Sequence, residues 1–183
     1  MAAIVIIGDG PGGLSAALFL ARGGHGVTVI GADATAMHFA HLNNYLGAPD
    51  TPGSALQATG KDQVLTAGAT LEAATVVAVS AEGDRFLVTT DDEANHDADY
   101  VVLSEGRKHP LGDALGLEHT PSGALAVDRD QRTSRDRVYA LGRATRPTRS
   151  QAIISAGDGA VAALDILARE AGGDVQDWDK PPA

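Results

Sequence analysis

The chain has 183 residues, a formal net charge of −10 and no cysteine. Its length allows one domain with a sizeable core, and the missing thiols exclude disulfides, thiolate metal sites and dithiol redox chemistry in this chain. The acidic charge argues against nucleic-acid binding, and no apolar stretch is long enough to span a membrane. The N-terminus lacks the basic lead of an export signal, so we expect a cytoplasmic protein.

The N-terminus has the pattern of a strand that turns through glycines into a helix. The apolar run 2–7 leads into Gly-Asp-Gly-Pro-Gly-Gly, and a helix rich in alanine follows before a second strand from Val27 to Ile30. Such a unit is typical of a dinucleotide-phosphate site, where glycines permit a tight turn, a close pyrophosphate and a closely packed helix. The predicted phosphate-binding residues are Gly8, Gly10, Pro11, Gly12 and Gly13.

The middle of the chain reads as a loop, a helix and an antiparallel meander. The irregular stretch from Gly31 to Gly53 is long for a connection, which favours a functional loop. A helix is expected from about Ser54, with apolar positions at Leu56, Val64 and Leu65. Strands are then predicted at Thr75–Val79, Arg85–Thr90 and Tyr100–Leu103, with a hairpin turn at 82–84 and an acidic connection at 91–97.

The last third predicts one more buried strand and a long helix. The strand runs from Val138 to Leu141 and the helix from Ala152 to about Ala171. Gly157 and Gly159 near the start of the helix would allow close approach of a ligand or of backbone. Residues 172–183 are expected to form a frayed tail. The predicted apolar face of the helix comprises Ile153, Val161, Leu164, Ile166 and Leu167.

Three separated segments of the chain resemble segments of a known family and follow one another in the same order as in that family. They are Ile4 to Ala17, Asn44-Tyr45-Leu46-Gly47-Ala48-Pro49, and the block from Val127 to Ala160. Together they resemble flavoprotein oxidoreductases with two dinucleotide-binding domains, in the thioredoxin reductase-like branch. The resemblance implies an α/β fold, a three-layer Rossmann-like FAD-binding domain with an antiparallel β-meander over residues 1–171, with FAD as cofactor and a homodimer as the assembly.

The segment between Gly106 and Val127 is too short for the family's second domain. Full-length relatives insert an NADPH-binding domain there, which carries a redox Cys-x-x-Cys, whereas a βαβ unit needs at least ~30 residues. The chain therefore resembles the single-domain, thioredoxin reductase-related proteins. Neither disulfide reduction nor a dedicated NADPH site is implied.

The resemblance also assigns site residues, with three departures from the family pattern. Gly31 stands where an acidic residue usually ends the second strand, and Asp33 is a substitute two residues later. Gly142-Arg143 replaces Gly-Asp, so Arg143 either meets the pyrophosphate or marks a lost site. Ser104-Glu105-Gly106 replaces Ala-Thr-Gly. Besides the glycine turn, the expected FAD-binding residues are Asp33, Asn44, Gly106, Gly142, Arg143, Gln151, Ala152 and Ile153.

No catalytic residue or metal site is assigned from the sequence. His38 and His41 are read as polar loop residues, with proton transfer near the flavin as the alternative. Glu105 is either a solvated carboxylate or a buried acid-base group. Asp158 is expected to interact with a helix N-terminus and Tyr139 to lie in the core. Gln151 has the strongest functional case, because the family places it beside the isoalloxazine.

Three functional hypotheses follow. The first is an oxidoreductase that passes electrons from an external donor through FAD to a small acceptor or a partner redox protein. The second is a non-catalytic flavin- or nucleotide-binding module, such as a redox sensor. The third is an NAD(P)-binding domain without flavin. The excess of aspartate over glutamate also resembles the acidic surfaces of proteins from salt-loving archaea.

Overall fold

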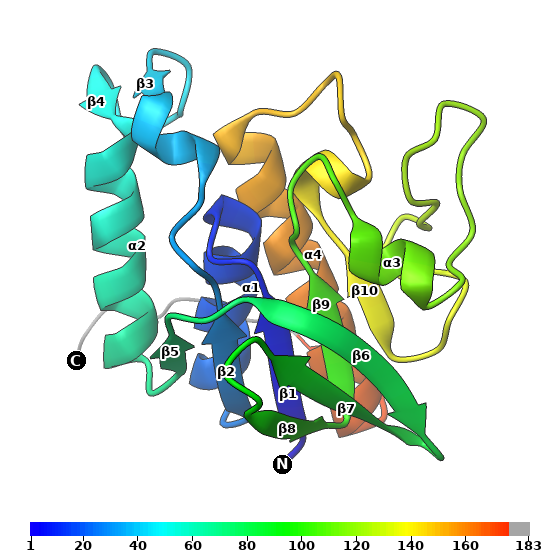
Figure 1. Ribbon diagram of the computed structural model, residues 1–183. Helices are drawn as coiled ribbons and strands as arrows, with labels where there is room; N and C mark the ends of the chain where they lie inside the picture. The colour runs from blue at the N-terminus through cyan, green and yellow to red at the C-terminus, as the bar shows by residue number, and fades with distance from the viewer. Residues whose placement is uncertain (176–183) are drawn as a thin grey trace.

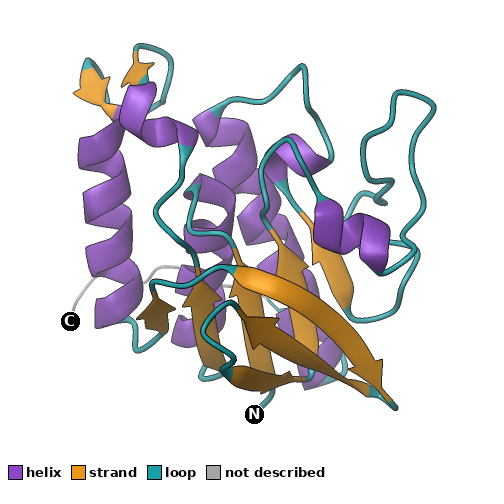
Figure 2. Ribbon diagram, in the orientation of Figure 1, coloured by secondary structure: helices purple, strands orange, loops and turns teal. Residues whose placement is uncertain are grey.

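The computed structural model describes residues 1–175, which form three layers (Figure 1). The central layer is a parallel sheet with the strand order β10-β9-β1-β2-β5. Helices cover one of its faces, and an antiparallel sheet in the order β6-β7-β8 covers the other (Figure 2). The predicted Rossmann-like fold with a meander is confirmed.

The elements have the following bounds. The central strands are β1 (Ala3–Ile7), β2 (Gly26–Ile30), β5 (Thr70–Glu72), β9 (Tyr100–Leu103) and β10 (Val138–Ala140). The meander consists of β6 (Val76–Glu82), β7 (Arg85–Thr90) and β8 (Asn95–Ala98). The α-helices are α1 (Pro11–Arg22), α2 (Gly53–Thr66), α3 (Pro110–Ala114) and α4 (Ala152–Ala171). Short elements are η1 (Ala36–Phe39), β3 (His41–Leu42), β4 (Thr51–Pro52) and η2 (Gly142–Ala144).

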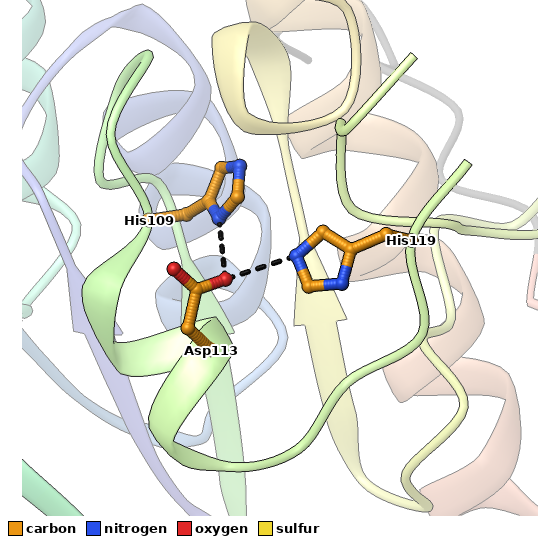
Figure 3. Close-up of side chains that lie close together, drawn as sticks. All are labelled: His109, Asp113 and His119. Atoms are coloured by element: carbon orange, nitrogen blue, oxygen red, sulfur yellow. Dashed lines mark hydrogen bonds and ion pairs between the residues drawn. The ribbon is translucent and has the colours of Figure 1, made fainter. Parts of the chain in front are cut away.

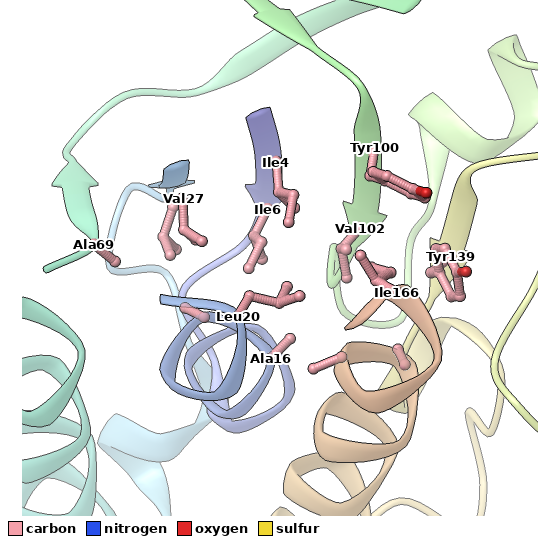
Figure 4. Packing of buried hydrophobic residues seen from close by; sticks show 14 of the residues in the cluster. Ile4, Ile6, Ala16, Leu20, Val27, Ala69, Tyr100, Val102, Tyr139 and Ile166 are labelled. Atoms are coloured by element: carbon pink, nitrogen blue, oxygen red, sulfur yellow. The ribbon is translucent and has the colours of Figure 1, made fainter. Parts of the chain in front are cut away.

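The first strand shows why the central sheet is apolar on both faces. Ile4 and Ile6 pack against the helices, while Val5 and Ile7 pack toward the meander. Because parallel strands in such folds are covered on both sides, they read as continuous apolar runs. Figure 4 shows the helix-side cluster, in which side chains of the sheet meet Leu20 of α1 and Ile166 of α4.

Helices α1 and α4 cross at a glycine. A Cβ atom on Gly159 would lie 2.1 Å from the Gly12 carbonyl oxygen and 2.9 Å from the Ala16 nitrogen, so only glycine permits this approach. The backbone does not approach Gly157 in the same way, because a Cβ atom there would meet nothing within 4 Å. On the predicted apolar face of α4, Ile166 and Leu167 are buried, whereas Ile153 and Val161 are 36% and 38% exposed, so the apolar face extends beyond the buried one. Small side chains form much of that face, since α1 lies so close.

Two strands and one helix face differ from the sequence prediction. Strand β5 is a short edge strand beside β2, and β8 occupies part of the acidic stretch predicted as a connection. On α2, Val64 is buried as predicted, but Leu65 is 51% exposed. Gly172, with φ of 72°, ends α4, and residues 176–183 of the predicted tail lie outside the described residues.

None of the described helices is long and apolar enough to cross a membrane.

Candidate functional site

A groove of about 1200 Å³ lies where four central strands end. Its lining includes the residues that directly follow β1, β2, β9 and β10, namely Gly8, Gly31, Ser104 and Leu141. Ligands of open α/β sheets bind outside the carboxyl ends of the strands, so this groove is the candidate site. Most of the predicted site residues line it: Gly8, Gly10, Pro11, Gly12, Asp33, Asn44, Gly106, Gly142, Arg143, Gln151 and Ala152.

Two predicted site residues do not line the groove. Gly13 lies behind the turn, where a Cβ atom would be 2.0 Å from the Gly8 carbonyl oxygen. Its role is to let α1 start immediately beside the strand, as the glycine pattern predicts. Ile153 is exposed on the first turn of α4 and is absent from the groove lining.

The glycine turn is closed on its inner side and open toward the groove. Gly8 has φ of 105°, and a Cβ atom on it would lie 2.3 Å from the Ser104 carbonyl oxygen. A Cβ atom on Gly10 would meet only the Thr35 hydroxyl, at 3.6 Å. Gly10 is also the N-cap of α1 and supplies no side-chain hydrogen bond to the first turn. Amide groups of a helix N-terminus are therefore presented to the groove, which suits a pyrophosphate.

Beyond the end of β2, the side chain of Asp9 occupies the space that a side chain at Gly31 would need. A Cβ atom on Gly31 would lie 2.7 to 2.8 Å from the Asp9 side-chain atoms. Asp9 is only 7% exposed. The acidic residue that usually ends the second strand is replaced by Gly31 in this chain. In the structure, the Asp9 carboxylate of the glycine turn lies at that place instead.

Lys61 of α2 joins this carboxylate to the predicted substitute, Asp33. Its Nζ atom lies 2.9 Å from Asp9 Oδ2 and 2.5 Å from Asp33 Oδ1. The hydrogen bond from Lys61 lowers the pKa of the Asp33 carboxyl. Gln57 of the same helix donates a hydrogen bond to the Asp9 carbonyl oxygen, while its own buried Oε1 atom has no partner within the described chain. One end of the groove is thus a side-chain network with two carboxylates.

At the other end, two segments 107 residues apart meet. Asn44 Nδ2 donates a hydrogen bond to Gln151 Oε1 over 3.2 Å. Both residues line the groove, and each comes from a different block of the family resemblance. The resemblance assigns this end to the isoalloxazine, and the contact brings the two assigned side chains together.

Asp158 has a different role from the one predicted. It lies in the second turn of α4, so it is not a first-turn charge at the helix N-terminus. Asp158 Oδ2 accepts a hydrogen bond from the Gly142 nitrogen over 3.2 Å and pairs with Arg146. This buried carboxylate fixes the turn after β10. Within residues 1–175, the Arg143 side chain on the same turn makes no hydrogen bond or ion pair, and it lines the groove.

The remaining candidates have local partners. His38 Nε2 lies 3.0 Å from Asp33 Oδ2, and His41 Nε2 lies 2.7 Å from Asp50 Oδ1. Burial raises the pKa of the Glu105 carboxyl, which accepts hydrogen bonds from two backbone amides at the start of α3. Tyr139 is fully buried, as predicted.

Sequence reasoning missed several residues of this site. Asp9, Lys61 and Gln57 were not predicted, and Ser155, which also lines the groove, was not predicted either. One signal was available for Asp9: a carboxylate inside the glycine turn coincides with a glycine at the end of the second strand. The positions of Lys61 and Gln57 depend on how α2 packs, which the sequence pattern does not give.

Known proteins share this fold. A thioredoxin reductase from Gloeobacter violaceus superposes with a TM-score of 0.91 at 18% identity, covering 98% of this chain and 99% of that chain. A ferredoxin-flavin thioredoxin reductase from Clostridium acetobutylicum gives 0.81 at 19% identity, covering 93% and 98%. The T. acidophilum thioredoxin reductase gives 0.79 at 18% identity, covering 93% and 99%. No match was found among curated proteins.

A family model adds sequence support to these structural similarities. The model for pyridine nucleotide-disulphide oxidoreductases matches residues 55–159, which is more than half of the chain. This match confirms the predicted resemblance to pyridine nucleotide-disulphide oxidoreductases and FAD as the cofactor of that family. The thioredoxin reductases named above share the fold. The chain belongs to the pyridine nucleotide-disulphide oxidoreductase family.

Proposed function

We propose that this protein binds FAD in the groove and acts as a flavin oxidoreductase. The observation that carries the proposal is the convergence of four strand ends on a backbone turn that is open only toward the groove. The N-terminus of α1 would hold the pyrophosphate, and Arg143 would add a cationic partner to it. When bound, FAD would accept a hydride or electrons from a donor and release them to an acceptor.

The side-chain network at the end of β2 would hold the adenosine ribose. Ribose hydroxyls donate hydrogen bonds to a carboxylate at this position in dinucleotide-binding folds. Asp9 occupies that place, and its ion pair with Lys61 orients the nearly buried carboxylate. Asp33 would be the outer member of the network, because it is half exposed and reaches Asp9 only through Lys61.

Electron transfer would involve partners from outside this chain. The chain has no cysteine, so a dithiol cannot relay electrons within it. We propose a soluble donor and either a small acceptor or a partner redox protein, in line with the ferredoxin-flavin and thioredoxin reductases that share the fold. A flavin-binding module without turnover is the alternative, and an NAD(P)-binding domain without flavin comes third.

The first experiment is an absorption spectrum of the purified protein. Flavin bands, with FAD identified by mass spectrometry after release, support the proposed cofactor. A colourless protein that also rejects added FAD overturns it. Steady-state oxidation of NADH or NADPH by the flavin-loaded protein then separates the first two hypotheses: sustained turnover supports an enzyme, whereas stoichiometric FAD without turnover across many donors supports a module.

We further propose that residues 1–171 act as one FAD-binding domain and that two copies form a homodimer. The exposed side of α4 supports the second proposal, because it presents Ile153, Ile154 and Val161 at 36 to 38% exposure. Sedimentation equilibrium should give twice the chain mass. A Val161→Glu variant should shift the equilibrium toward monomer, and a wild-type monomer at all concentrations contradicts the dimer.

A further inference from the structure

Outside the groove, three potential metal ligands meet beside α3 (Figure 3). Asp113 Oδ1 lies 3.0 Å from His109 Nδ1 and 2.9 Å from His119 Nε2. One donor atom from each residue lies within 4.8 Å of the other two. The two imidazole rings have their centroids 5.3 Å apart. The carboxylate and both rings therefore face one point in space.

The backbone that carries the cluster is fixed on both sides. His109 and Asp113 are joined through α3, where the Asp113 nitrogen donates to the His109 carbonyl oxygen over 3.1 Å. Glu105 accepts hydrogen bonds from the amides of Leu111 and Gly112, and the Leu111 side chain is buried in the core. His119 is held by a β-bridge to Leu125. The ligands are thus positioned before any ion binds.

We propose that His109, Asp113 and His119 form a binding site for a divalent first-row metal ion, of which Zn²⁺ is the best match. Imidazole nitrogen and carboxylate oxygen bind Zn²⁺ at about 2.0 to 2.2 Å, which places the donors of a tetrahedral site about 3.4 Å apart. The Asp113 oxygen lies 3.0 and 2.9 Å from the two ring nitrogens, slightly closer than that value, so small side-chain rotations complete the geometry. A water molecule would take the fourth position. The sequence alone predicted no metal site.

The site is suited to hold α3 and the following loop together. The His109 side chain is only 13% exposed, whereas those of His119 and Asp113 are 36% and 57% exposed. An ion can therefore enter from solvent and bind a ring anchored at the protein surface. Because Arg107 and Lys108 just before the site line the groove, a bound ion would also stiffen that edge of it.

The test is isothermal titration of tag-free, chelator-treated full chain with ZnCl₂. We expect about one high-affinity ion per chain. His119→Ala and Asp113→Asn should each weaken binding at least about tenfold, because even outer-shell changes at metal sites reduce affinity 10- to 100-fold. His41→Ala is the matched control, since His41 also pairs with an aspartate, Asp50, but has no third ligand within the described chain. It should leave the affinity unchanged.

Two results would overturn the inference. One is the absence of saturable Zn²⁺ binding to the wild-type chain. The other is equal affinity in the wild type and the His119→Ala and Asp113→Asn variants, which would assign binding to scattered surface groups. Far-UV circular dichroism confirms that each variant is folded, and His109→Ala provides a third ligand variant. The titration is run with and without FAD, and we expect Zn²⁺ to bind in both cases.

Discussion

The pyrophosphate part of the groove and its adenosine end are built by different means. The pyrophosphate part consists of backbone: glycines whose Cβ atoms would lie 2.0 to 2.3 Å from carbonyl oxygens, and the N-terminus of α1. The adenosine end consists of side chains, in which Asp9, Lys61 and Asp33 form a chain of ion pairs. The pyrophosphate part therefore accepts no side chain at Gly8 or Gly13, whereas the adenosine end can take its carboxylate from the neighbouring turn instead of the strand end.

The largest effect is expected beside the backbone-built pyrophosphate part. Gly159→Ala places a Cβ atom 2.1 Å from the Gly12 carbonyl oxygen and should separate α4 from the glycine turn. We expect a loss of about 3 kcal/mol or more in the free energy of unfolding, measured by urea denaturation. Gly157→Ala is the control on the same helix: it meets open space and should stabilise by about 0.5–1 kcal/mol. Equal effects of the two substitutions would contradict the close approach of α1 and α4 at Gly159.

The next effect concerns the two carboxylates of the adenosine end. Asp9→Ala should weaken FAD binding by about 10- to 100-fold, because hydrogen bonds to a charged group contribute about 1.5–3 kcal/mol. Asp33→Ala is the matched variant and should weaken it less than about threefold, since Asp33 reaches Asp9 only through Lys61. Fluorescence titration of the apoprotein with FAD measures both. A larger loss for Asp33→Ala would assign the ribose to Asp33.

A smaller effect is expected from the ion pairs themselves, and it depends on pH. Lys61 lowers the pKa of Asp33, so this pair stabilises the fold above the carboxyl's unfolded pKa and loses its effect as pH falls through the lowered value. Lys61→Met should destabilise by about 1 kcal/mol at neutral pH. Its difference from the wild type should shrink below about pH 4. Thermal unfolding at several pH values measures this difference, and a pH-independent difference would contradict the assigned role.

The smallest effect is expected at the isoalloxazine end. Gln151→Ala removes the hydrogen bond from Asn44, worth about 0.5–1 kcal/mol, and should weaken FAD binding about two- to fivefold. The control Gln63→Ala alters an exposed glutamine on α2 and should change nothing. A loss for Gln151→Ala as large as that for Asp9→Ala would mean that side chains matter equally at both ends of the groove.

The backbone-built part of the site could be predicted from the sequence better than the side-chain network. The glycine turn and α4 were predicted because backbone constraints leave residue patterns. Glycine occurs where a Cβ atom would clash, and continuous apolar runs occur where both sheet faces are covered. The predicted apolar face of α4 coincides only partly with its buried face, since close packing against α1 places glycine and alanine there and leaves Ile153 and Val161 more exposed.

Side-chain networks leave weaker traces in the sequence. Lys61 reaches Asp9 because α2 packs beside α1, and no local pattern encodes that distance. The cluster at α3 was missed for a related reason. His109, Asp113 and His119 have no familiar ligand spacing, and they come together only because the loop after α3 turns back to pair with Leu125.

The most direct test of this account is to exchange the carboxylate between the turn and the strand end. FAD affinity would be measured for the wild type, Asp9→Gly, Gly31→Asp and the double variant. We predict that each single change weakens binding at least about tenfold, the first by removing the carboxylate and the second by its clash with Asp9. The double variant should recover to within about threefold of the wild type. A double variant that binds no better than Asp9→Gly would contradict the proposal that Asp9 holds the ribose.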